Sequence, residues 1–423
     1  MLTDLSPALA PLVDSRTGVI RALEPRTVPA HFPEPFALLH AVLSDSATFS
    51  PWRSDASGAG YAFGDREAMR GAAIGEAVER YCGNLVSGRL VRSTANDLRG
   101  VDHVSPEDLA LPERSPFDSD TTTDWAVGRD AATDADVLVP ASAVWVSYNL
   151  QAAPSLHPVM QAGLAAERSL DAAQFGGLRE IVERDAMSRA WTGGGGVVSL
   201  TVPAWVDAFA AGPRRRIEPR WLLFPTDTGV PIVGALIRDT TTGYLTLGMG
   251  TAENPTAATL KALGEALQLQ LFVADLDDEN GPYARIAADP RSPLAPHRSD
   301  RRYARSYAAD LSDVRDYGCH LQLHLDPGIQ STFLEELDAS IVGRTALDAL
   351  PPGPGLRGLI ERFAALGERV ITVDVTTDDV RPSGLRVVRM LVPGRVSNAP
   401  HAHPFVGGRR PIQPVPRPTP LPH

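Results

Sequence analysis

Two stretches of the chain repeat one five-residue pattern, Glu76-Ala-Val-Glu-Arg80 and Glu180-Ile-Val-Glu-Arg184. Each lies within a run that predicts a helix, the first over about residues 65–81 and the second over about residues 170–191. Positions i, i+3 and i+4 are neighbours on a helix, so each pattern places two glutamates and an arginine on one face. The ordinary interpretation is an exposed ion pair that contributes about 0.2–0.5 kcal/mol.

The residues around both patterns favour burial instead. The first pattern lies in Gly71-Ala-Ala-Ile-Gly-Glu-Ala-Val-Glu-Arg-Tyr-Cys82, where small and apolar residues surround the acids. The second follows Phe175-Gly-Gly-Leu178 and precedes Ala186-Met187. Such helices pack closely, and buried carboxylates need partners.

If the two helices face one another, they gather four carboxylates that repel each other unless divalent cations lie between them. The predicted metal ligands are Glu76, Glu79, Glu180 and Glu183. Oxygen ligands in an incomplete protein cage suit Mg²⁺ that also binds phosphate. Arg80 and Arg184 then match phosphate oxygens with their planar guanidinium groups.

Two further segments are weaker candidates for the same site. A third helix is predicted to begin at Pro255, with Asn254 as its cap, and it places Glu265 and Gln268 on one face. Alone, that pair fits a solvated surface better, but beside the other two helices it becomes a candidate third wall. The segment Ser57-Gly58-Ala59-Gly60, before the first helix, is a candidate glycine-rich turn whose backbone N–H groups approach a phosphate.

Lysine usage excludes one large class of nucleotide sites. Lys261 is the only lysine, and it follows Leu260. A P-loop needs a Gly-Lys-Ser/Thr sequence, so none exists here. Any ATP must therefore be bound through magnesium, arginine and backbone N–H groups.

Composition sets further limits. The net charge is −11, which argues against a nucleic-acid partner. Cys82 and Cys319 are the only cysteines, too few for a disulfide framework or a zinc site, which fits a reducing cytoplasm. We expect a cytoplasmic protein with no membrane span and no secretory signal.

The remaining patterns predict a mixed α+β fold with helices packed on β-sheets. Strands are expected at 137–140, 144–146, 221–225, 230–238, 244–250, 370–375 and 385–392, and surface loops at 281–300 and 343–357. His320 and His324 alternate with apolar residues as on a strand. The end, Pro411–His423, has proline at nearly every second position and predicts an extended chain. We divide the chain into a lead-in region (1–50), an ATP-binding catalytic domain (51–405) and a proline-rich tail (406–423).

Taken together, these motifs resemble the YcaO family. The resemblance rests on the Ser-Gly-x-Gly segment with Ala-x-x-x-Glu-Ala-Val-Glu-Arg, on the run from Gly163 to Ala186, and on Ala258–Gln268. Val387–Gly394 and His403–Arg409 resemble the later part of the family. The match extends from about residue 12 to the end.

The resemblance implies ATP and Mg²⁺ bound by the glutamates, with Ser57, Gly58, Gly60, Arg80, Arg184, Glu265 and Gln268 at the nucleotide. Within the family, the proline-rich end is similar to that of azoline-forming cyclodehydratases of thiopeptide and linear azole pathways. In those enzymes the tail reaches the active site and its terminal carboxylate assists catalysis, which here implies the α-carboxylate of His423. The implied reaction converts Cys, Ser or Thr of a ribosomally made precursor peptide to an azoline by phosphorylating the backbone amide oxygen.

The resemblance also implies partners. No Cys-x-x-Cys occurs, so the zinc-binding, ubiquitin-activating-like (ThiF-like) domain that recognises leader peptides is expected as a separate protein. A flavin dehydrogenase and a homodimer are compatible with this picture.

Two alternatives stay open at this point. One is the same ATP chemistry with another nucleophile, giving a thioamide or an amidine, although the proline tail favours azolines. The other is a catalytically silent scaffold of a peptide-modifying complex. It is favoured by Ala59 and Ala72, where the family has Lys and Ser, and by Gln161-Ala162-Gly163, where the family has Ser-Asn-Gly.

Overall fold

The computed structural model describes residues 5–45, 57–112, 115–151, 156, 159–160, 162–406, 408–416 and 419–423. Gln161 lies outside these residues. Within the described ranges the chain forms a mixed α/β fold of three sheets and ten α-helices, as the sequence predicts. The helices are α1 (Arg66–Asn84), α2 (Ala141–Val144), α3 (Val146–Gln151), α4 (Leu170–Trp191), α5 (Ala204–Ala210), α6 (Pro255–Leu276), α7 (Pro282–Ala287), α8 (Tyr317–Leu323), α9 (Pro327–Ala339) and α10 (Leu356–Ala365).

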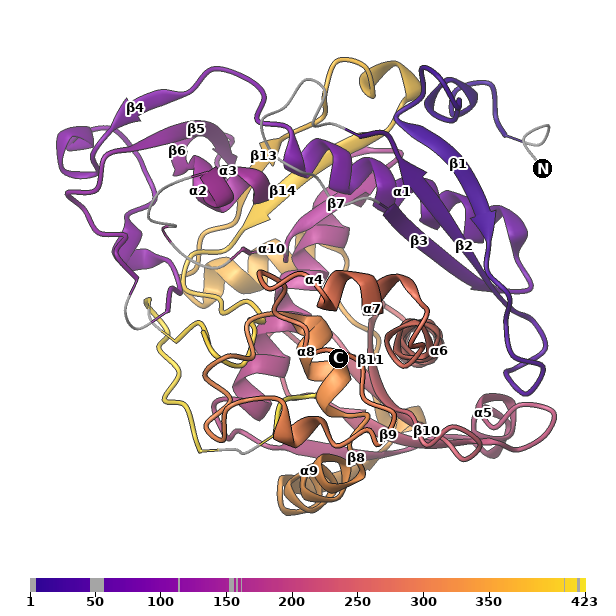
Figure 1. The fold of residues 1–423 in the computed structure, drawn as a ribbon. Coiled ribbons are helices and arrows are strands. Elements are labelled where there is room, and N and C mark those ends of the chain that lie inside the picture. The colour runs from indigo at the N-terminus through magenta and orange to yellow at the C-terminus, as the bar shows by residue number, and fades with distance from the viewer. Residues whose placement is uncertain are drawn as a thin grey trace.

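The strands make one small and two larger sheets (Figure 1). The sheet orders are β1-β2-β3, then β11-β10-β9-β8-β12, then β4-β5-β13-β14-β7 with β6 paired to β5. Described neighbours are antiparallel except β8 and β12. The strands are β1 (Ile20–Pro25), β2 (Phe36–Leu43), β3 (Ser57–Phe63), β4 (Val91–Ser93), β5 (Thr123–Asp130), β6 (Asp136–Pro140), β7 (Leu164–Glu167), β8 (Val197–Thr201), β9 (Ile217–Leu223), β10 (Ile232–Asp239), β11 (Leu245–Thr251), β12 (Ile341–Ala346), β13 (Ile371–Asp374) and β14 (Arg386–Leu391).

The three helices that carry the acidic residues begin where the sequence predicts. Asp65 caps α1 by accepting the N–H groups of Glu67 and Ala68. Ser169 caps α4 in the same way, and Asn254 caps α6. These caps satisfy backbone donors that have no partner inside the helix, so they fix the start of each helix.

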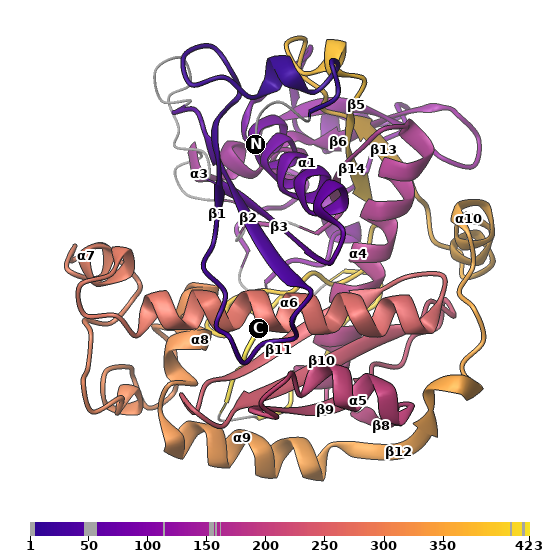
Figure 2. The same cartoon turned by 90° about the vertical axis from the view of Figure 1, so that its right-hand side faces the viewer.

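Strand β3 lies between two of these helices. Its alternate residues face opposite sides, so Gly58 and Gly60 face α1 whereas Tyr61 faces α6. The Tyr61 hydroxyl donates to the Lys261 carbonyl at 2.8 Å, and its ring leaves no room for a side chain at Gly264. In Figure 2, α6 runs between the β1–β3 sheet and the five-stranded sheet. The strand thus brings α1 and α6 together. The predicted boundary at residue 50 falls inside this sheet, between β2 and β3.

The glycines of β3 permit contact between the backbones of β3 and α1. A Cβ atom at Gly60 would lie 2.2 Å from the Ala73 nitrogen and 2.4 Å from the Met69 carbonyl oxygen. We expect Gly60→Ala to destabilise the fold by about 1–3 kcal/mol, because backbone atoms must move apart. The measurement is urea unfolding followed by circular dichroism.

Gly71→Ala is the matched control for that substitution. Gly71 lies in α1, and a Cβ atom there meets nothing within 4 Å. Alanine in a helix is favoured over glycine by about 0.5–1 kcal/mol, so this variant should be at least as stable as the unchanged chain. Equal stability of both variants would show that the strand does not depend on the close approach.

Several local expectations are wrong. His320 and His324 do not alternate on a strand, because Tyr317–Leu323 forms helix α8 with Asp316 as its cap. Residues 144–146 lie at the junction of α2 and α3. The expected loops contain α7, β12 and the start of α10. The expected glycine-rich turn is strand β3. Short apolar runs do not distinguish helix from strand, and packing decides between them.

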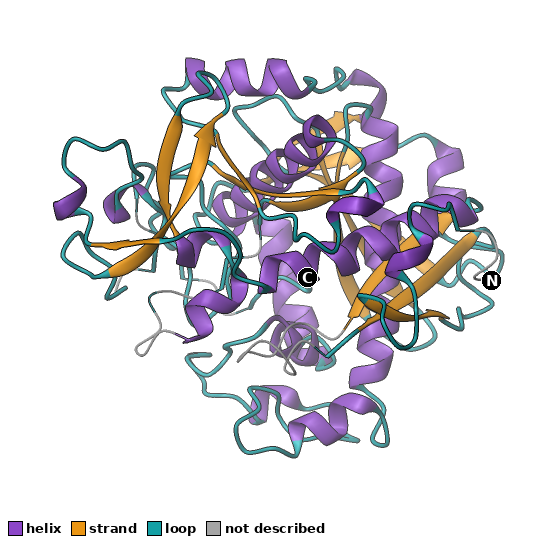
Figure 3. Cartoon of the chain, turned by 90° about the horizontal axis from the view of Figure 1, so that it is seen from above, coloured by secondary structure: helices purple, strands orange, loops and turns teal. Residues whose placement is uncertain are grey.

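Apolar packing fixes the positions of the three helices. One buried cluster joins α1 to the six-stranded sheet, a second joins α4 to the five-stranded sheet, and a third joins α6 to β2 and the five-stranded sheet. Helices and loops surround the sheets in the view from above (Figure 3). In the part of the chain that the structure describes, no helix has the length and apolar character needed to cross a bilayer.

Candidate functional site

A cavity of about 470 Å³ opens between α1, α4 and α6, and both Glu-x-x-Glu-Arg patterns contribute to its wall. We call it the acidic cavity. Its charged and polar lining residues are Glu76, Glu79, Arg80, Asn84, Glu167, Arg179, Glu180, Glu183, Arg184, Lys261, Glu265 and Gln268. Residues more than a hundred positions apart in the sequence thus share one polar chamber.

Each of the three helices has one glutamate bound to the backbone of a neighbouring strand or loop. Glu76 Oε2 accepts the N–H of Ala59 in β3 at 2.7 Å. Glu180 Oε2 accepts the N–H of Gly163, just before β7, at 2.9 Å. On α6, Glu265 Oε2 accepts the Met249 N–H of β11 at 2.8 Å. One oxygen of each carboxylate is therefore fixed by the fold, which orients the other.

The second oxygens face arginine. Glu76 Oε1 accepts a hydrogen bond from Arg80 Nη2 at 2.8 Å, an i,i+4 pair on α1. Arg184 stands among three acids at longer distances, 3.8 Å from Glu180, 3.5 Å from Glu183 and 3.9 Å from Glu265. These separations exceed ordinary hydrogen bonds, so Arg184 balances the charge of the three acids without a close hydrogen bond to any of them.

Glu183 is the most deeply placed acid of the two patterns. Its side chain is only 4% exposed. Its Oε2 atom is buried and finds no hydrogen-bond partner among the described residues. A buried, unpartnered carboxylate oxygen is costly, and a divalent cation is the kind of group that removes the cost.

Burial, and for Glu79 also the neighbouring carboxylates, raises the pKa of acids in the cavity. Burial raises the pKa of Glu79 well above its usual value, and Glu180 and Glu76 raise it further. Burial also raises the pKa of Glu180 and of Glu265. Burial lowers the pKa of Arg184, but the surrounding carboxylates, Glu183 first, outweigh this and raise it overall. The cavity is thus an electrostatically strained site that favours bound cations.

The proline-rich tail ends beside Arg184. Arg184 Nη1 donates to His423 Nε2, and because arginine cannot accept, the imidazole proton lies on Nδ1 and is donated to the Leu247 carbonyl at 3.0 Å. The Pro422 carbonyl accepts the Leu247 N–H at 2.6 Å. Burial, helped by Arg184, lowers the pKa of His423 to about 4, which keeps this imidazole neutral. The views in Figures 1 and 2 agree that the C-terminal residue lies in the middle of the molecule.

The structure gathers most of the predicted site residues. The residues brought to one cavity are Glu76, Glu79, Arg80, Glu180, Glu183, Arg184, Glu265 and Gln268, with His423 against Arg184. Ser57, Gly58 and Gly60 do not line the cavity. Their neighbour Ala59 does, and its N–H is already used by Glu76. A phosphate contact of that segment stays a prediction, and the glycines have the packing role described above.

The four predicted metal ligands share the cavity without converging on one point. Among the described residues, no group of three or more His, Cys, Asp or Glu side chains is arranged to hold one metal ion. The donor set nevertheless fits Mg²⁺, because it is all oxygen, has the unpartnered Glu183 Oε2 and leaves room for phosphate. Metal ligation by these glutamates therefore stays a prediction.

Three basic residues were missed from the sequence. Lys261 lines the cavity one helical turn before Glu265. Its i,i+4 spacing from Glu265 could have placed it at the site from the sequence. Arg179 lines it too, and its Nε atom is buried without a described partner. Arg389 interrupts the apolar strand β14, is 1% exposed, and donates to the carbonyls of Val144 and Ala162 at 2.9 Å. Burial lowers the pKa of Arg389 to about 10, and Glu180 and Glu79 oppose that effect.

Comparison with known proteins identifies the family. Residues 59–396 match the family described as YcaO cyclodehydratase, ATP- and Mg²⁺-binding. This match spans more than half of the chain, so the chain belongs to the YcaO cyclodehydratase family. ATP and Mg²⁺ are the cofactors of this family of ATP-dependent enzymes, which confirms the cofactors predicted from the sequence.

Solved structures share the fold at low sequence identity. A heterocyclase in complex with substrate and cofactor is 19% identical with a TM-score of 0.65, covering 91% of this chain and 51% of that one. The YcaO protein of Methanopyrus kandleri bound with AMPPCP and Mg²⁺ is 22% identical with a TM-score of 0.59, covering 91% of both. The Escherichia coli microcin synthetase McbBCD complex with pro-MccB17 is 12% identical with a TM-score of 0.56, covering 88% of this chain and 87% of that one.

A curated relative is less informative. An uncharacterized protein of Methanothermobacter thermautotrophicus is 30% identical over 213 residues, which are 48% of this chain and 54% of the relative. The chain thus spans about half the length of that relative.

The raised carboxyl pKa values predict how Mg²⁺ affects stability at different pH. The fold is least destabilised by Glu79, Glu180 and Glu265 when all three are protonated, below their ordinary pKa of 4.5. Because the pKa of each is raised in the folded state, this contribution to the free energy of unfolding is lost as pH rises through the raised pKa values. Bound Mg²⁺ offsets the resulting repulsion. We expect the rise in melting temperature on adding MgCl₂ to be larger at pH 8 than at pH 5.5, measured by scanning calorimetry against KCl of equal ionic strength. A rise that is equal at both pH values, or larger at pH 5.5, would contradict this account.

Proposed function

We propose that this chain is an ATP-dependent cyclodehydratase that converts Cys, Ser or Thr residues of a ribosomally made precursor peptide to azolines. The observation that carries the proposal is the acidic cavity, in which two Glu-x-x-Glu-Arg helices and α6 surround Arg184, and Arg184 in turn contacts His423. Arg184 thereby links the proposed site for Mg²⁺ and triphosphate to the proline-rich tail.

In this proposal the chain's acids hold the metal and its arginines hold the phosphates. Glu76, Glu79, Glu180 and Glu183 supply oxygen ligands, with Glu76 and Glu180 pre-oriented by their backbone contacts. Bound Mg²⁺ supplies neutralisation of phosphate charge. Once the acids are neutralised, Arg184 Nη2 can turn from its long contacts with Glu180 and Glu265 toward a phosphoryl oxygen, while Nη1 keeps its hydrogen bond to His423.

The chemistry solves a leaving-group problem. The substrate thiol or hydroxyl loses its proton and bonds to the preceding backbone carbonyl carbon, which gives an oxyanion. That oxygen takes the γ-phosphoryl group, the carbon–oxygen bond then breaks, and phosphate leaves while the amide nitrogen loses its proton to form the C=N bond. The balance is one water lost from the peptide and one ATP converted to ADP and phosphate.

The end of the tail is assigned a catalytic and a positioning role. In this proposal His423 assists catalysis, as the family resemblance implies. The imidazole of His423 is held between Arg184 and the Leu247 carbonyl, which anchors this residue of the tail beside the phosphate-binding arginine. A separate leader-binding partner of the ThiF-like class presents the precursor peptide. The microcin synthetase, itself a complex with a pro-peptide, supports this arrangement by its fold.

The test of the function is a mass measurement. The full chain is mixed with ATP, Mg²⁺, a candidate leader-binding partner and a Cys-containing precursor peptide, and intact peptide masses are followed. We expect loss of about 18 Da per ring, dependent on ATP. An exchange of oxygen for sulfur would point to thioamide formation, and unchanged but bound peptide would point to a scaffold; either outcome overturns the proposal.

A further inference from the structure

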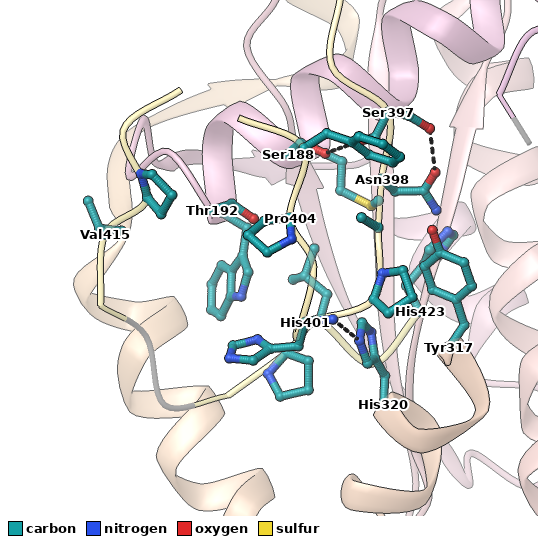
Figure 4. Close-up of a pocket in the computed structure, with 18 of the residues that line it drawn as sticks. Ser188, Thr192, Tyr317, His320, Ser397, Asn398, His401, Pro404, Val415 and His423 are labelled. Atoms are coloured by element: carbon teal, nitrogen blue, oxygen red, sulfur yellow. Dashed lines mark hydrogen bonds between the residues drawn. The ribbon is translucent and has the colours of Figure 1, made fainter. Parts of the chain in front are cut away.

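A second pocket, of about 270 Å³, lies between the C-terminal half of α4, helix α8 and the proline-rich tail. Figure 4 shows its walls, with His423 and Tyr317 at one side and Val415 and Thr192 at the other. We call it the tail pocket. Of the described residues that line it, none is Asp, Glu, Lys or Arg, in contrast to the acidic cavity.

The tail pocket continues the acidic cavity along one face of α4. Glu183 and Arg184 line the cavity, and Met187 and Ser188, one turn later on the helix, line the pocket. One turn rises about 5.4 Å, whereas adjacent residues of an extended peptide are about 3.8 Å apart. His423 stands at the junction, since it lines the pocket and contacts Arg184. A peptide reacting at the cavity therefore has its next side chain within reach of the pocket.

The chemistry of the wall selects against charge. Trp191 and Phe405 supply aromatic surface. The polar groups are largely paired within the protein, since Trp191 Nε1 donates to the Thr419 carbonyl at 3.1 Å and His320 Nε2 accepts the His401 N–H at 3.0 Å. Burial lowers the pKa of His320, to about 3, and of His401, so both imidazoles are neutral. A charged side chain placed here would lose its hydration without gaining a partner.

We infer that the tail pocket binds an uncharged apolar or aromatic side chain that directly flanks the ring-forming residue of the peptide substrate. The inference rests on the proposed function, because it assigns the pocket to the same peptide. The volume is sufficient, since a cavity of about 150 Å³ lined by apolar groups holds benzene. The pocket acts as a specificity determinant that is separate from the metal and phosphate site.

Photocrosslinking tests this assignment without requiring turnover. The probes are two synthetic hexapeptides, Gly-Ser-Bpa-Cys-Gly-Ser and Gly-Ser-Cys-Bpa-Gly-Ser, where Bpa is the photoreactive p-benzoylphenylalanine. Each is irradiated with the full chain in the presence of Mg²⁺ and AMPPCP, and the adducts are mapped by mass spectrometry. We expect the main adduct of at least one probe on Met187 or within residues 397–405. Competition with the Phe analogue of that probe should reduce the adduct at least about tenfold more than competition with the Asp analogue.

Filling the pocket gives a second arm. Ala399→Phe places a ring in the tail pocket and should remove the adduct, whereas Ala364→Phe, an exposed position on α10 outside the pocket, should leave it. The inference would be overturned by adducts only outside the pocket, by no specific adduct, or by equal competition from the Phe and Asp analogues. If the filled variant does not fold, the competition experiment still decides. Ring formation assayed in parallel reports on the proposed function alone, so the two failures are distinguishable.

Discussion

Replacing Glu183 with glutamine is expected to reduce ATP-dependent peptide modification by about 100- to 1000-fold or more. The substitution keeps the size of the side chain and removes the negative charge of the most deeply placed acid in the two patterns. Its Oε2 atom, buried without a described partner, is the oxygen best suited to meet a cation. An amide supplies one weaker oxygen and an NH₂ group that a metal repels, so affinity for Mg²⁺–AMPPCP should fall as well, by at least about tenfold.

Stability separates this role from a structural one. Removing one charge from a cavity where the carboxylates repel each other should leave the melting temperature of metal-free Glu183→Gln equal to or above that of the unchanged protein. If Glu183 served mainly to pair Arg184, 3.5 Å away, the variant would melt lower. Glu361→Gln is the matched control, because Glu361 is exposed on α10 and pairs only with Arg357 in the described part of the chain. The control should change neither activity nor nucleotide affinity.

A variant lacking Leu421–His423 is expected to lose about 100-fold in turnover while its affinity for Mg²⁺–AMPPCP changes less than about threefold. The preceding residues hold the tail independently of the deleted ones. The Thr419 carbonyl accepts from Trp191, and the Pro420 carbonyl accepts from His324 Nε2 at 2.8 Å. The deletion therefore removes the group beside Arg184 without releasing the rest of the tail.

Comparing turnover with binding decides what the end of the tail does. Single-turnover modification reports the chemical step, and calorimetric titration with Mg²⁺–AMPPCP reports binding. Equal losses in both would mean that the tail only supports the nucleotide site, and no loss in either would remove His423 from the mechanism. His423→Gln refines the result, because a glutamine oxygen can still accept from Arg184 and should restore part of the turnover.

The three helices that build the site were predictable from local sequence. Asp65, Ser169 and Asn254 each stand where a helix needs a cap, and the repeated pattern places its acids on one face whatever the rest of the chain does. The assembly of the acids in one cavity was predicted from their burial, because buried carboxylates need partners. The structure brings them together, although it does not arrange them around one ion.

Local sequence patterns could not predict the features that tertiary packing determines. The segment Ser57–Gly60, expected as a glycine-rich turn, forms the start of strand β3, and its glycines let β3 touch the backbone of α1. His320 and His324 alternate like a strand but lie in and just after helix α8. Arg389 interrupts the apolar run of strand β14, and only the fold shows that it lies near Glu79 and Glu180. In each case the partner is distant in sequence, so periodicity carries no information about it.

The central claim is that the acidic cavity holds the metal ions of a bound nucleotide, and anomalous diffraction tests it most directly. Crystals grown with Mn²⁺ and AMPPCP would be measured near the manganese absorption edge. We predict anomalous peaks within about 2.0–2.3 Å of oxygens from both helix patterns, Glu183 included, with triphosphate beside Arg184. Nucleotide bound elsewhere, or manganese peaks that avoid these glutamates, would contradict the account.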